Sequence, residues 1–208
     1  MLITFQRLKV VVIDIQYRPS NNLKIVVAGE GGVGKTTMIE SLKCGHFYPN
    51  TMMTIAVQFH TMAFEFDDRT VNLQIWDLGG QRHFFNMGIF RKYYHGAHAT
   101  LLCFDITDLD TLEEIPKWID ILPPKIPRIL VGTKADMTDE SGIEDIKAIA
   151  QPYLETFKLN GFLFSDITNI LGIQNIFRTL IALSVDVQQR KGTIDVNSAL
   201  VAKLVTKK

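Results

Sequence analysis

This chain of 208 residues has few cysteines, no long apolar runs and no excess of either charge. The only cysteines, Cys44 and Cys103, lack the spacing of a metal site, which favours a reduced, intracellular setting over a disulfide framework. The counts of basic and acidic residues are both 22, so the net charge gives no argument for nucleic acid or an acidic membrane surface as a partner. No stretch has the length of a membrane-spanning helix.

Targeting signals are also missing from both ends of the sequence. The apolar run Val10–Ile13 is too short for the core of a signal peptide. Residue 2 is Leu, which excludes N-myristoylation as the sequence stands, and the final letters VTKK contain no cysteine for a prenyl group. We therefore expect no lipid-anchor motif, no nucleic-acid partner, and a cytoplasmic protein that reaches a membrane only through a partner.

Apolar residues make up 47% of the chain, enough for one packed domain with terminal extensions. After an initial hairpin, short apolar runs alternate with segments of helical spacing, which predicts a mostly parallel sheet. The expected strands are 23–28, 55–66, 70–76, 99–104, 128–132 and 161–164, and the expected helices are 36–43, 110–118, 143–158 and 173–189. The fold class is thus α/β, a six-stranded mixed sheet (five strands parallel, one antiparallel) with helices on both faces.

Local signals refine this outline. We expect Asp110 to cap its helix and Pro116 to kink that helix rather than break it. Residues 79–90, with three glycines, predict a mobile loop. The domain should span 23–190, between an N-terminal extension at 1–22 and a C-terminal tail at 191–208.

The stretch GEGGVGKT, residues 29–36, follows a predicted strand and precedes a predicted helix. It fits the phosphate-loop pattern G-x-x-x-x-G-K-S/T, in which backbone N–H groups and the helix N-terminus cradle phosphate oxygens. Lys35 would reach the β- and γ-phosphates and Thr36 would ligate Mg²⁺. A merely flexible surface loop is the alternative, but the Lys-Thr pair and the strand-loop-helix context oppose it. The predicted phosphate-binding residues are Gly29, Glu30, Gly31, Gly32, Val33, Gly34, Lys35, Thr36 and Thr37.

An acidic residue follows the predicted strand VNLQIW. Asp77 stands at the end of this strand and opens the letters DLGGQ. Mg²⁺ retains several waters and needs few protein ligands, so one carboxylate here is sufficient. Asp77 is therefore predicted to hold the metal, directly or through water.

The ordered motifs GEGGVGKT, TIAVQF, WDLGGQ and TKAD resemble the Ras superfamily of small GTPases over about residues 23–189. The letters FDITDLDTLEEIPKW are similar to the same region of Rab- and Ras-like domains. The motifs WDLGGQ and VGTKAD are similar to those of the septum-promoting, mitotic-exit GTPases, and the double glycine before Gln is shared with Arf-like proteins. The resemblance implies a P-loop NTPase that binds GTP or GDP with Mg²⁺ and slowly hydrolyses GTP. It further implies effectors, a GTPase-activating protein and an exchange factor, engaged through switch I (about 45–57) and switch II (about 79–92).

The resemblance also assigns roles at the γ-phosphate. Thr54 matches the switch I threonine that engages Mg²⁺ and the γ-phosphate, and Gly80 the glycine whose N–H senses that phosphate. Gln81 matches the glutamine that orients the attacking water. Gly31 and Gly32 leave room for the γ-phosphate and for an incoming arginine. The expected catalytic residues are therefore Gln81, Lys35 and Thr54, and the metal ligands are Thr36, Thr54 and Asp77.

Recognition of the guanine base is expected to rest on the motif TKAD, together with Phe47 and Ile167 elsewhere in the chain. Asp136 would accept hydrogen bonds from N1 and N2 of guanine, a donor pair that adenine lacks, and a carboxylate left unpaired would cost about 1–3 kcal/mol. Lys134 would lie along the nucleotide, and Phe47 would pack edge-on against guanine. Thr133 replaces the more usual Asn, as in Rho-like GTPases.

The last motif departs from the family. Asp166, Ile167 and Thr168 stand where the family has Ser-Ala-Lys, so the backbone N–H of Ile167 is predicted to reach guanine O6. The alternative is a strand-to-helix turn without a role in binding.

Other interpretations stay open. A nucleotide-bound adaptor that never cycles would fit the altered last motif, and a P-loop kinase or ATPase would fit the phosphate loop alone. His95 and His98 lack a third metal ligand, so we interpret them as solvated or helix-capping. The tail carries one apolar helical face through Val196, Leu200 and Leu204, which could pack on the domain, bind a partner or a membrane surface, or stay disordered.

Overall fold

The computed structural model describes residues 22–49, 51–66, 69–81, 90–123 and 125–190. Its strands are β1 (Asn22–Ala28), β2 (Val57–Phe66), β3 (Arg69–Leu78), β4 (Ala99–Asp105), β5 (Arg128–Thr133) and β6 (Gly161–Ser165). Its helices are α1 (Lys35–Cys44), α3 (Phe90–Tyr94), α4 (Asp110–Glu113), α5 (Ile115–Ile121), α6 (Glu140–Phe157) and α7 (Ile170–Arg190), with a 3₁₀ turn η1 (Ala135–Met137). None of these described helices is long and apolar enough to cross a bilayer.

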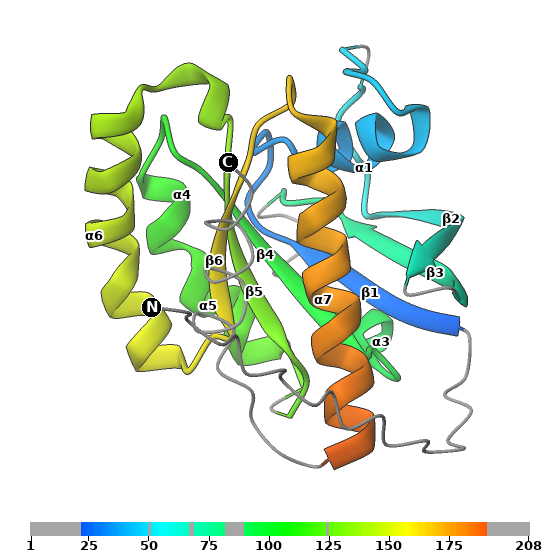
Figure 1. Ribbon diagram of the computed structural model, residues 1–208. Helices are drawn as coiled ribbons and strands as arrows, with labels where there is room; N and C mark the ends of the chain where they lie inside the picture. Colours follow the sequence, from blue (N-terminus) through cyan, green and yellow to red (C-terminus); the bar gives the residue numbers. More distant parts are fainter. Residues whose placement is uncertain (1–21, 50, 67–68, 82–89, 124, 191–208) are drawn as a thin grey trace, which may run out of the picture.

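The strands form one six-stranded sheet in the order β2-β3-β1-β4-β5-β6 (Figure 1). β1 pairs in parallel with β3 and β4, and the parallel pairing continues through β5 to β6. Only β2, at one edge, runs antiparallel, with Val57 opposite Leu78 and Phe66 opposite Arg69. The predicted fold class, with five parallel strands and one antiparallel strand, is confirmed.

Each central strand buries both of its faces, which is why these strands are continuous apolar runs. Along β1, Ile25 and Val27 face a core shared with α1 and α7, whereas Val26 and Ala28 face a second core against α3 to α6. Figure 1 shows α7 lying across one face of the sheet, with α4, α5 and α6 on the other side. The carboxyl ends of β1, β3, β4, β5 and β6 therefore meet at one edge of the sheet, where ligands of such folds bind.

The helix expected at 110–118 is two helices, so the prediction of a kink was wrong. α4 ends at Glu113 and α5 begins at Ile115 with Pro116 in its first turn. Proline has no N–H to donate, and its ring clashes with the carbonyl four residues earlier, which interrupts the helix. Asp110 is the first helical residue rather than the cap, because Leu109 occupies the cap position without a side-chain hydrogen bond.

Other boundaries also differ from the predictions. Phe90, placed at the end of a loop, begins α3 and is buried. Asn22, assigned to the N-terminal extension, begins β1. His95 is exposed, as predicted, whereas the half-buried ring of His98 caps no helix and instead accepts a hydrogen bond at Nδ1 from the backbone N–H of Lys24 in β1 at 2.9 Å. The predictions for 1–21, for most of switch II (82–89) and for the tail at 191–208 fall outside the described residues.

Candidate functional site

The loop between β1 and α1 has a backbone conformation that only glycine adopts without strain at several positions. Gly29, Gly32 and Gly34 have φ values of 139°, 80° and 92°, in the left-handed region that favours glycine. A Cβ on Gly29 would lie 2.0 Å from the carbonyl oxygen of Cys103, so β4 also requires glycine at this point. The loop leads into α1, whose N-terminus has no side-chain cap. This is the arrangement in which helix N–H groups and the helix dipole bind anions.

Lys35 is buried in the turn of this loop. Its side chain is 5% exposed, and its ammonium donates to the carbonyl oxygens of Gly29 at 2.8 Å and Glu30 at 2.7 Å. Burial lowers the pKa of Lys35, while the nearby carboxylate of Asp77 raises it. The loop therefore encloses the ammonium group of Lys35, in a position where it could contact a bound phosphate.

Three oxygen-bearing side chains from different elements meet beside Lys35. The hydroxyl of Thr36, at the start of α1, lies 2.7 Å from the hydroxyl of Thr54 and donates to Oδ2 of Asp77. The hydroxyl of Thr54 also reaches Oδ2 of Asp77, at 3.3 Å. Asp77, at the end of β3, is fully buried; burial raises its pKa, whereas the hydrogen bond from Thr36 and the charge of Lys35 lower it.

This cluster fits Mg²⁺. The ligands are hard oxygens, and Oδ1 of Asp77 is buried without a hydrogen-bond partner in the described part of the chain. Within the same residues there is no group of three or more His, Cys, Asp and Glu side chains that could hold a metal. A site with one carboxylate and two hydroxyls suits an ion that retains several waters.

A cavity of 260 Å³ extends from the loop to the segment 51–54 and to Gly80. Gly80 touches the loop directly: its carbonyl oxygen accepts a hydrogen bond from the N–H of Gly31 at 3.1 Å, and a Cβ on it would lie 2.1 Å from the carbonyl carbon of Glu30. Beside it, Nε2 of Gln81 donates to Sδ of Met53 at 2.8 Å. The start of switch II and the end of switch I thus meet at this cavity.

A second cavity, of 250 Å³, lies beyond the loop at the ends of β5 and β6. It brings together five residues predicted to bind the base. These residues are Phe47, Thr133, Lys134, Asp136 and Ile167, and the cavity is also lined by Gly34, Thr37, Pro49, Met137 and Ser165. The sequence predicted Gly34 and Thr37 as nucleotide-binding residues but not Pro49, Met137 and Ser165. Of these three, only Ser165, at the end of a parallel strand, has a signal that could have identified it.

The floor of this cavity is tied to the phosphate loop. The hydroxyl of Thr133, at the end of β5, lies 2.5 Å from the carbonyl oxygen of Val33 and 2.8 Å from that of Phe104. Lys134 follows with a left-handed backbone, φ 60°, and its ammonium pairs with Asp105. A single buried hydroxyl thus links the loop to two strands.

The altered last motif forms a self-contained turn. The N–H and the hydroxyl of Thr168 both donate to Oδ1 of Asp166, at 2.7 and 2.6 Å. The side chain of Asn169 accepts from the N–H of Gly172 at 2.9 Å and so caps α7. Ile167, between these groups, is half-buried against the cavity. The turn keeps its shape through residues of its own, without the Ser and Lys of the family pattern.

The sequence profile of the Ras family matches residues 24–186, most of the chain. The chain belongs to the Ras family. The GTP-binding protein ypt1 of Schizosaccharomyces pombe is 29% identical over 173 residues, which cover 81% of either chain. The Ras-related protein RABA4b of Arabidopsis thaliana is 32% identical over 76% of this chain and 70% of its own length, and the Ras-related protein Rab-1C of Dictyostelium discoideum is 35% identical over 59% of this chain and 62% of its own.

Membership of the Ras family, with Rab-like relatives, gives the general function. The protein is a small GTP-binding switch and a GTPase, and its ligands are GTP, GDP and Mg²⁺. The adaptor that never hydrolyses GTP and the P-loop kinase are not favoured by these relatives.

Proposed function

We propose that the two cavities together bind one molecule of GTP, with phosphates in the first and guanine in the second. The observation that carries this is the convergence of Thr36, Thr54 and Asp77 next to the buried ammonium of Lys35. In this assignment the loop N–H groups and Lys35 bind the phosphates, and the other three residues hold Mg²⁺. Mg²⁺ held by these residues would neutralise charge that develops on the phosphate oxygens.

The guanine end depends on Asp136. Its carboxylate accepts from N1 and N2 of guanine, which selects guanine over adenine, while the N–H of Ile167 donates to O6. Phe47 packs on the base from switch I, and Lys134 stays fixed by its ion pair with Asp105. The lining of the second cavity by these side chains supports the assignment.

Hydrolysis depends on Gln81, which orients the attacking water. Gly31 and Gly32 keep space for the γ-phosphate, because a Cβ on Gly32 would meet no atom within 4 Å and one on Gly31 would come no nearer than 3.7 Å to its neighbours. None of the described residues lining the first cavity is an arginine. Intrinsic hydrolysis is therefore slow, and a GTPase-activating protein supplies the missing cation.

Effectors recognise an aromatic surface beside switch I. The rings of Phe59 on β2, Trp76 on β3 and Tyr93 on α3 lie 4.5 to 6.3 Å apart, and Phe59 is 57% exposed. The ammonium of Lys24 lies 3.4 Å from the centre of the Trp76 ring, which adds a cation–π contact to the cluster. An exposed aromatic group of this size, next to residues that bind nucleotide, is suited to a protein partner that senses the nucleotide state.

The remaining assignments follow the sequence. Residues 22–190 form the GTPase domain, the segments 1–21 and 191–208 flank it, and switch I (45–57) and switch II (79–92) change with the γ-phosphate. An exchange factor reloads the protein with GTP. The protein works in the cytoplasm and reaches membranes through a partner.

Single-turnover hydrolysis tests this function. Protein loaded with GTP and Mg²⁺ should convert it slowly to GDP, and Gln81→Leu should slow the conversion at least about tenfold without weakening GDP binding. Gln151→Leu, at an exposed position on α6, is the matched control. Unchanged turnover in the Gln81 variant would favour the adaptor, whose hydrolysis residues would be idle.

A further inference from the structure

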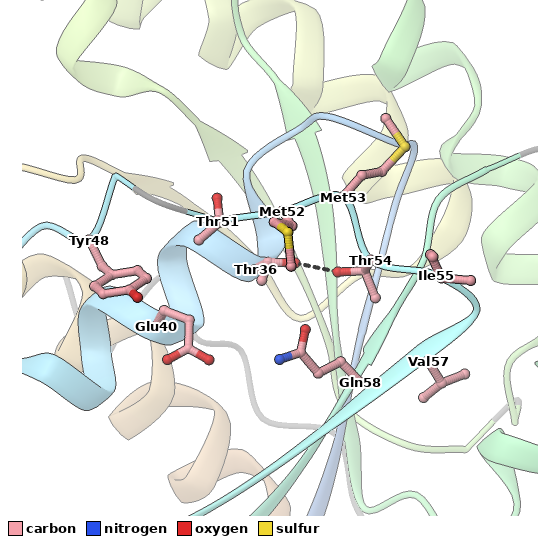
Figure 2. Close-up of a pocket in the computed structure, with 10 residues that line it drawn as sticks. All are labelled: Thr36, Glu40, Tyr48, Thr51, Met52, Met53, Thr54, Ile55, Val57 and Gln58. Atoms are coloured by element: carbon pink, nitrogen blue, oxygen red, sulfur yellow. Dashed lines mark hydrogen bonds between the residues drawn. The ribbon is translucent and has the colours of Figure 1, made fainter.

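A third cavity, of 470 Å³, is distinct from the phosphate and base cavities, although it shares part of its lining with the phosphate cavity. It opens between α1, switch I and β2, and Figure 2 shows Glu40 of α1 and Gln58 of β2 at its border, with Tyr48 close to Glu40. None of the described residues that line it carries a positive charge. The cavity therefore offers oxygen acceptors and one carboxylate to whatever enters it.

Glu40 has a fixed position at this cavity. Its Oε1 lies 3.2 Å from Nδ1 of His60, a residue of β2 whose side chain is 1% exposed. Burial lowers the pKa of His60, so near neutral pH the carboxylate faces an uncharged ring that does not compete for its charge. Glu40 also pairs with Lys43 at 2.9 Å, but that side chain is 35% exposed and the pair lies at the surface. Pairs of this kind contribute little to stability, so a stronger cationic partner would displace Lys43.

We propose that this cavity binds the guanidinium group of an arginine side chain from a protein partner. A guanidinium presents parallel N–H donors that match a carboxylate, which the ammonium of Lys43 cannot do. Its planar face fits against the ring of Tyr48, and its aliphatic stem fits against Met52 and Ile55, which line the same cavity.

Occupation of the cavity is coupled to the nucleotide. Five residues line both this cavity and the phosphate cavity, namely Thr36, Thr51, Met52, Met53 and Thr54. Residues 51–54 of switch I and Thr36 of α1 thus form a wall between the two cavities. An arginine on one side of this wall contacts residues whose position depends on Mg²⁺ and phosphate on the other. Any effect of nucleotide on arginine binding implies an equal effect of arginine on nucleotide binding. This coupling, unlike the cavity itself, rests on the proposed roles of Thr36 and Thr54.

The probe is N-acetyl-arginine amide, and N-acetyl-citrulline amide is its neutral isostere. Methionine-methyl NMR of the full chain loaded with GDP and Mg²⁺ should show saturable shifts of Met52 and Met53 with arginine, while Met137, in the base cavity, stays in place. Glu40→Gln keeps the size and shape of the side chain and should weaken binding at least about fivefold, because only the charge is lost. Glu144→Gln removes an equivalent ion pair, with Lys147 on α6, and should change nothing.

The titration is then repeated with a non-hydrolysable GTP analogue. A difference in affinity of at least about threefold between the two states is expected from the shared wall. A dissociation constant weaker than about 50 mM, equal binding of citrulline, or unchanged binding by Glu40→Gln would overturn the site. Equal affinity in both states would overturn the coupling. Nucleotide loading is measured first, so a chain that binds no GDP refutes the proposed function, whereas a loaded chain that ignores arginine refutes only this inference.

Discussion

Removing the hydroxyl of Thr133 tests how the phosphate loop is anchored to the sheet. In Thr133→Val the side chain keeps its shape, but the carbonyl oxygens of Val33 and Phe104 lose the hydroxyl that lies 2.5 and 2.8 Å from them. Thr133 is 3% exposed, so water cannot replace the lost donor without opening the structure. Leaving a buried acceptor unpaired costs about 1–3 kcal/mol, and we expect the free energy of unfolding to fall by that amount.

The same loss should appear in nucleotide binding, because Val33 belongs to the loop that holds the phosphates. If the loop carries the whole cost, release of a fluorescent GDP analogue accelerates about 5- to 140-fold. Stopped-flow measurement of this release, with urea unfolding in excess GDP and Mg²⁺, gives both quantities on one protein sample.

Thr179→Val is the control for this substitution. Thr179 is as buried as Thr133, at 4% exposure, but its hydroxyl donates within α7 to the carbonyl oxygen of Asn175 at 2.8 Å. Such bonds within a helix add little, so a small loss of stability and unchanged GDP release are expected. If Thr133→Val behaved like this control in both assays, the hydroxyl of Thr133 would not anchor the loop.

Three further predictions follow from the site and the core. Asp136→Asn replaces an acceptor by an amide donor, so GDP should bind at least about tenfold more weakly while xanthosine diphosphate, which has an oxygen at position 2, binds better in competition assays. Gly80→Ala would place a Cβ 2.1 Å from the backbone of Glu30, so single-turnover hydrolysis should slow while GDP binding persists, and unchanged turnover would show that this contact is dispensable. Burial lowers the pKa of both His60 and His98 below 6.5, so as the pH falls through that value the unfolded chain takes up protons that the folded chain does not. The free energy of unfolding should therefore drop between about pH 7 and about pH 5.5 in urea titrations, less steeply in His98→Asn, and an identical slope in that variant would contradict the assignment.

The sheet was predictable because its strands are marked locally. The apolar letters of β4 are buried along their whole length, and the alternation of strand and helix requires parallel pairing. The break between α4 and α5 at Glu114 was harder to predict. Pro116 cannot donate to the carbonyl four residues before it, and the sequence does not show whether the fold can leave that carbonyl without a donor. α3 was missed because five residues are too few to show helical periodicity.

The site divides in the same way. The loop from Gly29 to Thr36 is contiguous, so its motif identifies it without any knowledge of the fold. The base cavity is assembled from separate loops, and only the family resemblance connected Phe47, Asp136 and Ile167 before the structure was known. Glu40 and His60 gave no signal at all, because a carboxylate on α1 and a histidine on β2 become a pair only when the two elements pack.

The nucleotide that co-purifies with the full chain shows whether the protein binds guanine nucleotides. Protein purified without added nucleotide is denatured, and the released bases are separated and quantified by chromatography. We expect close to one guanine nucleotide per chain, mostly GDP, because slow hydrolysis precedes still slower release. Bound adenine nucleotide, or a chain that arrives without nucleotide and then takes up no GDP in the presence of Mg²⁺, would contradict this expectation.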